Sequence, residues 1–374
     1  MDHLRTASGG PPLGKYGTSS TLPGQGLAAR ASRHQLKAVQ REVTESVSSR
    51  LCGYPVGSDR VEVAIGREWV AHVGNVSHCG SPWNCSTCAP VIRMRRSLEV
   101  GQAVAYWQDL GHSVIFPTLT LPHAFGDPLG PRLSLICRAL GACHNGKGWN
   151  VRRDALGYVG SVRAPEITDG PNGWHAHLHA LLFVEGSVEA AALESYRVWL
   201  YERWTGVVQA AGFGTINRHG LDVKVTGRDS GRLGEYLQAV EGGWSMGAEL
   251  TQAASKRSKT AVDSLRLFSQ TGDMSGRARW LEWEGATAGK SSLRFSQGLR
   301  AKVLPEVEEV DDVEAASAEG LGRWLVRAWI EGEDWIRMLK SGESGEALRE
   351  LVEVAFVLVL MCDIAGCVPV ESEG

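Results

Sequence analysis

The sequence predicts an α+β protein built around an antiparallel sheet. The main observation is the stretch 173–183, in which three histidines alternate with small or apolar residues before an apolar run. A period of two is typical of a strand and places the three imidazoles on one face. Turn-forming residues at 168–173 follow an earlier apolar segment, so the two strands are expected to pair as an antiparallel hairpin.

The remaining elements are justified in chain order. Residues 1–35 are rich in Gly, Ser, Pro and Thr and are expected to be disordered. A strand at 61–65 and a helix at about 91–110 follow. Strands and helices then come in the order β-α-β-β-α-β-α, at 113–121, 129–140, 155–167, 173–184, 188–211, 221–225 and 232–240. This order is the ferredoxin-like plan, one antiparallel sheet with helices on one face, plus an additional helix.

Charge is distributed unevenly along the chain. Residues 305–374 hold 17 acidic and 5 basic residues, whereas residues 1–304 carry a net charge of +9. A basic body with an acidic tail suits a nucleic-acid binder. The expected parts are a disordered N-terminus, a small zinc-binding module with a basic helix, a catalytic domain, a basic extension and an acidic helical C-terminal region, at 1–35, 36–105, 106–260, 261–304 and 305–374.

Nothing in the sequence predicts a membrane or an export route. The first residues lack the apolar core of a signal peptide, and the most apolar stretch, residues 354–361, is too short to span a bilayer. Three of the eight cysteines fall within ten residues, which indicates metal binding rather than disulfides. A cytoplasmic protein without membrane contacts is therefore expected.

The clustered cysteines predict a structural zinc site. Cys85 and Cys88 form a CxxC knuckle that can place two thiolates on one tetrahedral ion. A redox role is the alternative for such a pair. Cys79 is close enough to supply a third ligand. Cys52 is the favoured fourth ligand, and His78 and His72 are the alternatives to it.

The histidine strand predicts a second metal site. Two imidazoles two residues apart on a rigid strand can bind one divalent ion. The expected hairpin brings Glu166 beside the histidines, and a carboxylate suits Mg²⁺ or Mn²⁺. Basic side chains after the knuckle, on a strand and in a later cluster are candidates for binding DNA phosphates. They are Arg93, Arg95, Arg96, Lys224, Lys256, Arg257 and Lys259.

Several motifs in this order resemble one family. They are the knuckle 79–88, the strand 118–123, Glu166 with residues 172–179, Tyr236-Leu237, the segment 244–251 and the segment 296–300. Over roughly residues 52–303 the chain is similar to the HUH-type rolling-circle replication initiators, the Rep proteins of small plasmids in high-GC Gram-positive bacteria.

The resemblance implies a specific site in an HUH nickase domain at 106–260. His177 and His179 would hold the catalytic metal with Glu166, and His175 is a further candidate. Tyr236 would attack a phosphate of one DNA strand, giving a 5′-phosphotyrosine link and a free 3′-OH primer, before the ends are rejoined. The implied partners are plasmid origin DNA, double-stranded and single-stranded, with a host helicase and a DNA polymerase.

The chain departs from the family pattern near the tyrosine. Ala239 stands where these proteins usually carry a lysine, and Lys224 on the neighbouring strand is the candidate substitute. Three other readings are an HUH-type transposase acting on transposon ends, a zinc-dependent DNA-binding regulator without catalysis, and a metallohydrolase of small molecules. A single tyrosine in its helix favours replication over transposition, and the histidine strand argues against a regulator.

Overall fold

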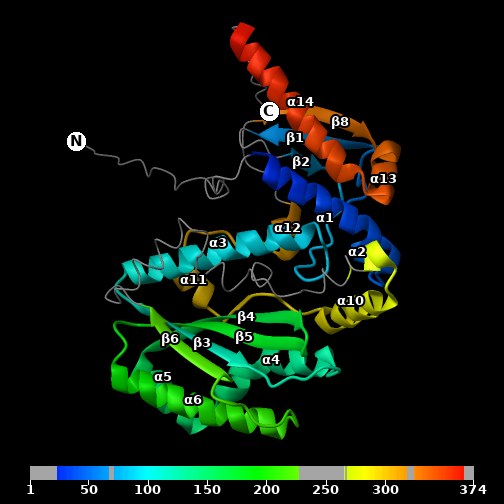
Figure 1. Ribbon diagram of the computed structural model, residues 1–374. Coiled ribbons are helices and arrows are strands. Elements are labelled where there is room, and N and C mark those ends of the chain that lie inside the picture. The colour runs from blue at the N-terminus through cyan, green and yellow to red at the C-terminus, as the bar shows by residue number, and fades with distance from the viewer. Residues whose placement is uncertain (1–22, 67–70, 227–264, 266–267, 318–323, 366–374) are drawn as a thin grey trace, which may run out of the picture. The chain divides into compact units, whose positions relative to one another are not determined.

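A computed structural model describes residues 23–66, 71–226, 265, 268–317 and 324–365 of the 374-residue chain. The chain divides into two compact units (Figure 1). The smaller unit contains Met1–Ala38, Gly53–Ser77 and Ser317–Gly374, and the larger unit contains Val39–Cys52 and His78–Ala316. Helices and antiparallel sheets occur in both, so the expected α+β class is confirmed.

An antiparallel sheet of five strands forms the centre of the larger unit, in the order β6-β3-β5-β4-β7. The two longest strands form the expected hairpin. Its turn ends at Gly173, where φ is +87° and an added Cβ would lie 2.9 Å from the Ala124 carbonyl oxygen, so glycine is required. The strands are β3 (Ser113–Thr120), β4 (Tyr158–Gly170), β5 (Gly173–Val184), β6 (Leu221–Thr226) and β7 (Arg294–Phe295).

Both faces of this sheet are covered, which corrects the expectation of helices on one face. One face packs against α4 (Leu129–Cys143), α5 (Gly146–Leu156) and α6 (Ala190–Ala210). The other packs against α3 (Cys88–Asp109) and the short α11 (Leu299–Val303), through a core that includes residues of β3, β4 and β5 (Figure 1). The cause is visible in residues 181–184 of β5, which are fully buried on both sides of the strand.

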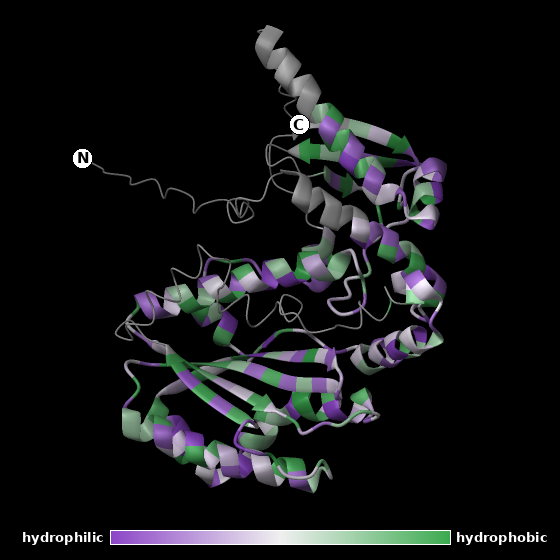
Figure 2. Ribbon diagram, viewed as in Figure 1, coloured by the Kyte–Doolittle hydropathy of each residue, from purple (hydrophilic) through white to green (hydrophobic). Residues whose placement is uncertain are grey.

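Hydrophobic and hydrophilic residues alternate in bands along the helices and strands of the larger unit (Figure 2). This pattern lets each helix bury one side while exposing another. The larger unit also contains α2 (Val47–Leu51), α10 (Met274–Thr287) and most of α12 (Asp312–Ser317). The sequence reasoning missed α5, and the helix expected at 232–240 lies outside the described residues.

The smaller unit contains a second antiparallel sheet, in the order β2-β1-β8. Alternate residues of β1, Val61, Val63 and Ile65, form its core with Trp335 and other side chains from the C-terminal helices. β8 lies in the region expected to be helical, and Trp329 on it is 55% exposed. The elements are β1 (Arg60–Gly66), β2 (Ala71–Gly74), β8 (Trp324–Glu331), α13 (Gly332–Ser341) and α14 (Ser344–Ala365).

The described chain begins with α1 (Pro23–Val43). Residues 23–35, which were expected to be disordered, therefore form the first part of a helix. Their leucine, alanines and arginines are strong helix formers, which the glycine- and serine-rich composition of the whole segment obscured. Among the helices that the structure describes, none is long and apolar enough to cross a membrane.

Candidate metal centres and DNA-binding residues

Three metal-binding side chains converge on the face of the sheet beneath α3. Glu166 on β4 is the register partner of His177 on β5, and His179 follows two residues later on the same face. The Glu166 Oε2 atom lies 2.7 Å from Nε2 of His177 and 2.7 Å from Nε2 of His179. The two Nε2 atoms are 3.0 Å apart, and all three residues are buried.

Neighbouring side chains orient this cluster. The His179 ring stacks on Phe116 at 5.4 Å, and its Nδ1 lies 3.1 Å from the Thr118 hydroxyl on β3. Such an outer hydrogen bond fixes the tautomer of a metal-binding histidine and leaves Nε2 for the ion. Burial by itself raises the pKa of Glu166, but the hydrogen bonds and charges of His177 and His179 outweigh it and hold that pKa below its ordinary value. Glu166 is therefore an anion at neutral pH.

The donor atoms fit a divalent ion. Adjacent ligands of an octahedral ion at 2.1 Å are about 3.0 Å apart, close to the three separations in the cluster. Two imidazoles and one carboxylate present one face of such an octahedron and leave the opposite positions open. The Glu166–His177–His179 cluster is thus compatible with a metal that also binds a substrate.

His175 lies outside this cluster. Its ring stacks on His123 at 4.8 Å and lies 4.8 Å from the His177 ring. Burial, followed by the charges of His177 and His123, lowers the pKa of His175 to about 4. The neutral imidazole continues a row of rings toward the loop after β3 but contributes no atom to the metal cluster.

The four expected cysteines come together in the larger unit. Sulfur–sulfur distances are 3.4 Å for Cys52–Cys88, 3.7 Å for Cys52–Cys85 and 3.9 Å for Cys79–Cys88. Ligands of a tetrahedral zinc with 2.3 Å bonds are about 3.8 Å apart, so the cluster is compatible with zinc. His78, one of the alternatives, approaches only as far as 3.9 Å from the Cys88 sulfur.

The electrostatics of the cluster agree with cation binding. Hydrogen bonds among the sulfurs, together with burial, raise the pKa of Cys52 and of Cys88 above the ordinary value. These thiols stay protonated unless a cation stabilises their thiolates. Cys88 also begins α3, so an ion at this site would fix the first turn of the helix that crosses the sheet.

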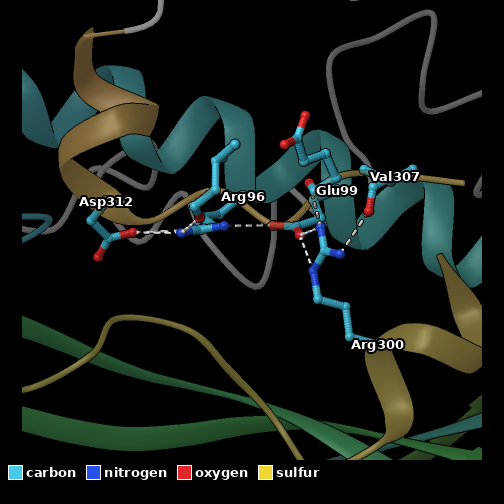
Figure 3. A network of polar contacts seen from close by, with 7 residues as sticks. Arg96, Glu99, Arg300, Val307 and Asp312 are labelled. Atoms are coloured by element: carbon cyan, nitrogen blue, oxygen red, sulfur yellow. Dashed lines mark hydrogen bonds and ion pairs between the residues drawn. The ribbon is translucent and has the colours of Figure 1, made fainter. Parts of the chain in front are cut away.

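The three arginines of α3 have different surroundings. Arg96 pairs with Glu99 and Asp312 at 2.9 Å each and donates to the Val310 carbonyl at 2.8 Å (Figure 3). Glu99 also pairs with Arg300 at 2.6 Å, so Arg96 belongs to an intramolecular network. Arg95 is half-buried near Glu314, and Arg93 donates from Nε to the Pro82 carbonyl at 3.1 Å.

The other basic candidates lie elsewhere. Lys224 on β6 is the register partner of Phe116, so it shares the sheet face of the metal cluster, and it pairs with exposed Asp222 at 3.0 Å. The remaining candidates, including the expected nucleophile, lie outside the described residues. They are Tyr236, Lys256, Arg257 and Lys259.

The sequence reasoning missed a brace on the hairpin. The Arg279 guanidinium on α10 lies 3.8 Å above the Trp174 ring and bonds both carboxylate oxygens of Asp169. The Trp174 indole donates to Glu282 at 2.8 Å. These contacts, called the Arg279 brace, hold the start of β5 against α10. Only the spacing of Arg279 and Glu282 on one helix face hinted at the brace in the sequence.

Comparisons with known proteins find two curated relatives. "Protein rep" of Streptomyces lividans is 28% identical over 339 residues, which cover 72% of this chain and 74% of that protein. "Neomycin resistance protein" of Streptomyces cyanogenus is 30% identical over 136 residues, covering 30% of this chain and 31% of that protein. No family model and no solved structure matches.

Proposed function

This chain is related to the Rep-family plasmid proteins of high-GC Gram-positive bacteria, and from that kinship we propose that it initiates rolling-circle replication of a plasmid. In this proposal the protein binds the double-strand origin and nicks one strand. The observation that carries the nicking activity is the buried convergence of Glu166, His177 and His179 on two paired strands, with donor separations suited to one ion. A purely structural role would not require two imidazoles and a carboxylate to face one point.

The reaction assigned to the site is transfer of a phosphodiester to Tyr236, which lies outside the described residues. The phenol oxygen forms a bond to phosphorus, and the bond from phosphorus to the 3′ oxygen breaks. The phenol gives up its proton and the 3′ oxygen gains one, so a 5′-phosphotyrosine and a free 3′-OH result. Reversal of the same exchange rejoins the ends when the circle is complete.

The described residues supply binding and orientation. A divalent ion, Mg²⁺ or Mn²⁺, held by the Glu166 cluster would draw charge from the phosphate and lower the barrier to attack by a group whose ordinary pKa is about 10. Thr118 and Phe116 hold His179 in its orientation, and the Arg279 brace holds the start of β5. The cysteine cluster, as a structural zinc site, would fix the beginning of α3.

The wider assignments belong to the same proposal. Arg95, Lys224, Lys256, Arg257 and Lys259 are proposed to bind origin DNA through its phosphates. The 3′-OH would be extended by a host DNA polymerase while a host helicase separates the strands.

The test is a search for the covalent adduct. The full chain is incubated with Mn²⁺ and single-stranded oligonucleotides of random sequence between constant ends, and adducts are separated under denaturing conditions. We expect a DNA–peptide adduct whose mass places the DNA on Tyr236. Tyr236→Phe should abolish it, and the matched control Tyr201→Phe on α6 should retain it.

Two results would overturn the proposal in different ways. An adduct on another residue would show that Tyr236 is not the nucleophile. DNA binding that does not depend on added Mn²⁺, with no adduct under any condition, would support a zinc-dependent regulator instead.

A further inference from the structure

Arg93 lies on the side of α3 that faces the metal-bearing sheet. The helix turns this side inward at every third or fourth residue, and the four positions that follow Arg93 on it are all buried. They are Ser97, Val100, Val104 and Trp107. Val100, Val104 and Trp107 pack into the core shared with the sheet. Arg93 continues this stripe toward the N-terminus of the helix, whereas Met94, one residue further, is 50% exposed.

The position of Arg93 along the sheet follows from the packing at the other end of α3. Trp107 contacts the Phe183 ring, with centroids 6.0 Å apart, and donates to the Val184 carbonyl at 3.0 Å. From Trp107 back to Arg93 is 14 residues, or about 21 Å of helix. From Phe183 back to His177 is six residues, or about 20 Å of strand. Figure 1 shows α3 running along this part of the sheet. The two lengths therefore bring Arg93 about level with His177, which agrees with the electrostatic interaction between Arg93 and Glu166.

Arg93 interacts electrostatically with the same cluster. Burial lowers the pKa of Arg93 to about 10, and the Glu166 carboxylate opposes this change, so the guanidinium stays protonated at neutral pH. Its Nε donates to the Pro82 carbonyl in the cysteine-bearing loop. That loop is anchored by Trp83, whose indole donates to the Lys290 carbonyl at 2.7 Å and whose ring meets Trp283 of α10 edge-on.

A divalent ion at the Glu166 cluster would leave this region with an excess of positive charge. The ion adds two positive charges and Arg93 adds one, while Glu166 supplies a single negative charge. A phosphodiester has two non-bridging oxygens, which the planar fork of a guanidinium binds through two parallel hydrogen bonds. An anionic phosphodiester between the ion and Arg93 would lower this net charge from +2 to +1.

We propose that Arg93 binds the phosphate that is to be cut, acting together with the metal of the Glu166–His177–His179 cluster. The inference rests on the proposed nickase function and deepens it. The inference assigns different roles to Arg93 and Arg96. Arg96 is held in the ion-pair network, whereas Arg93 faces the sheet. The inference also gives the cysteine cluster a role in catalysis, because the loop between its cysteines orients the guanidinium through Pro82.

The experiment compares Arg93→Gln and Arg93→Lys with Arg203→Gln, an exposed arginine on α6 at the opposite face of the sheet. The affinity of each full-length protein for a single-stranded oligothymidylate is measured with and without Mn²⁺. Mn²⁺ should strengthen binding to the wild-type protein. Arg93→Gln should lose this metal-dependent gain by about tenfold or more, the loss expected for a charge-assisted hydrogen bond. Arg93→Lys should retain part of it and Arg203→Gln all of it.

A second measurement separates phosphate binding from a structural role. Removing a positive charge beside the site should leave the affinity for Mn²⁺ alone unchanged or higher in Arg93→Gln. If Mn²⁺ affinity falls in parallel with DNA affinity, Arg93 positions Glu166 and the inference is wrong. If Arg93→Gln keeps the full metal-dependent gain, the inference also fails while the proposed function stands. If the wild-type protein gains nothing from Mn²⁺ and forms no adduct, the proposed function itself fails.

Discussion

Glu166 and His177 face each other directly across the β4–β5 hairpin, and one carboxylate oxygen of Glu166 lies 2.7 Å from Nε2 of His177. The same oxygen lies 2.7 Å from Nε2 of His179. A strand pair is a rigid support, so the three donors are held in place before any ion or substrate arrives. Preorganisation of this kind reduces the entropic cost of binding a metal.

Removal of either imidazole should therefore weaken metal binding. His177→Ala and His179→Ala should each weaken Mn²⁺ binding, measured by isothermal titration calorimetry, by at least the roughly tenfold to hundredfold that loss of a ligand's hydrogen-bond partner costs. His219→Ala, an exposed histidine before β6, is the matched control and should bind as the wild-type protein does. Retention of Mn²⁺ affinity by both cluster variants would exclude this site as the metal centre.

The cysteine cluster should carry one zinc ion that stabilises the fold. Cys85→Ser should remove about one equivalent of zinc, measured by plasma mass spectrometry of the purified protein, and lower the melting temperature. The reason is that free energy of zinc binding to a structural site is also free energy of folding. Cys137→Ser on α4, a cysteine outside the cluster, should keep its zinc. A full zinc content in Cys85→Ser would contradict the assignment.

The ion-pair network of Figure 3 should be sensitive to loss of its central carboxylate. Glu99 bonds both Arg96 and Arg300, and its side chain is only 10% exposed. Glu99→Gln leaves two arginines short of a counter-charge and should cost about 3 kcal/mol of unfolding free energy. Asp312→Asn, at the 31% exposed edge of the network, should cost about 1 kcal/mol. Urea denaturation measures both, and equal losses would show that Glu99 is not the centre of the network.

Stability should fall in mild acid because of His144. Burial, followed by the charge of Arg163, lowers the pKa of His144 to about 3, and its ring stacks on Trp149 and lies 3.0 Å from the Tyr196 hydroxyl. The unfolded chain, with an ordinary histidine pKa of about 6.5, takes up the proton first. With respect to His144, the free energy of unfolding therefore keeps its full value above pH 6.5. It decreases as pH falls toward 3, and the loss is about 2 kcal/mol at pH 5.

The measurement for His144 is the slope of unfolding free energy against pH between 4.5 and 6.5. His144→Gln should flatten this slope whatever its effect on absolute stability. His219→Gln, an exposed histidine, should leave the slope unchanged. An unaltered slope in His144→Gln would show that another group governs the acid response.

Local patterns predicted much of the metal cluster. The alternation of the histidines identified β5, and the turn residues before it placed Glu166 opposite them, because a hairpin register depends on residues close in sequence. The cysteine spacing predicted Cys79, Cys85 and Cys88 in the same way, and Cys52, the favoured fourth ligand, joins them in the structure. The choice of His177 and His179 over His175 came from family resemblance, and the structure places His175 outside the cluster.

Long-range relationships could not be predicted from the sequence. The pairing of β1 with β8 joins residues more than 250 positions apart, and the acidic composition around β8 concealed it. Arg93 was expected, with Arg95 and Arg96, to meet DNA phosphates because it follows the cysteine knuckle, but nothing in the sequence indicated which way it points. Its inward direction depends on the sheet beneath it, which no local pattern reveals.

The pairing of β1 with β8 also bears on the order of events during synthesis. β1 and β2 leave the ribosome early, yet the strand that completes their sheet comes after the entire larger unit has been made. Until then Val61, Val63 and Ile65 have no core to enter, since that core includes Trp335 and Leu339. The larger unit can finish folding first, whereas the smaller one must wait for its last segment. A nascent chain stalled before residue 324 would therefore expose the β1–β2 hairpin with one free strand edge and an uncovered apolar face, the kind of surface that chaperones bind.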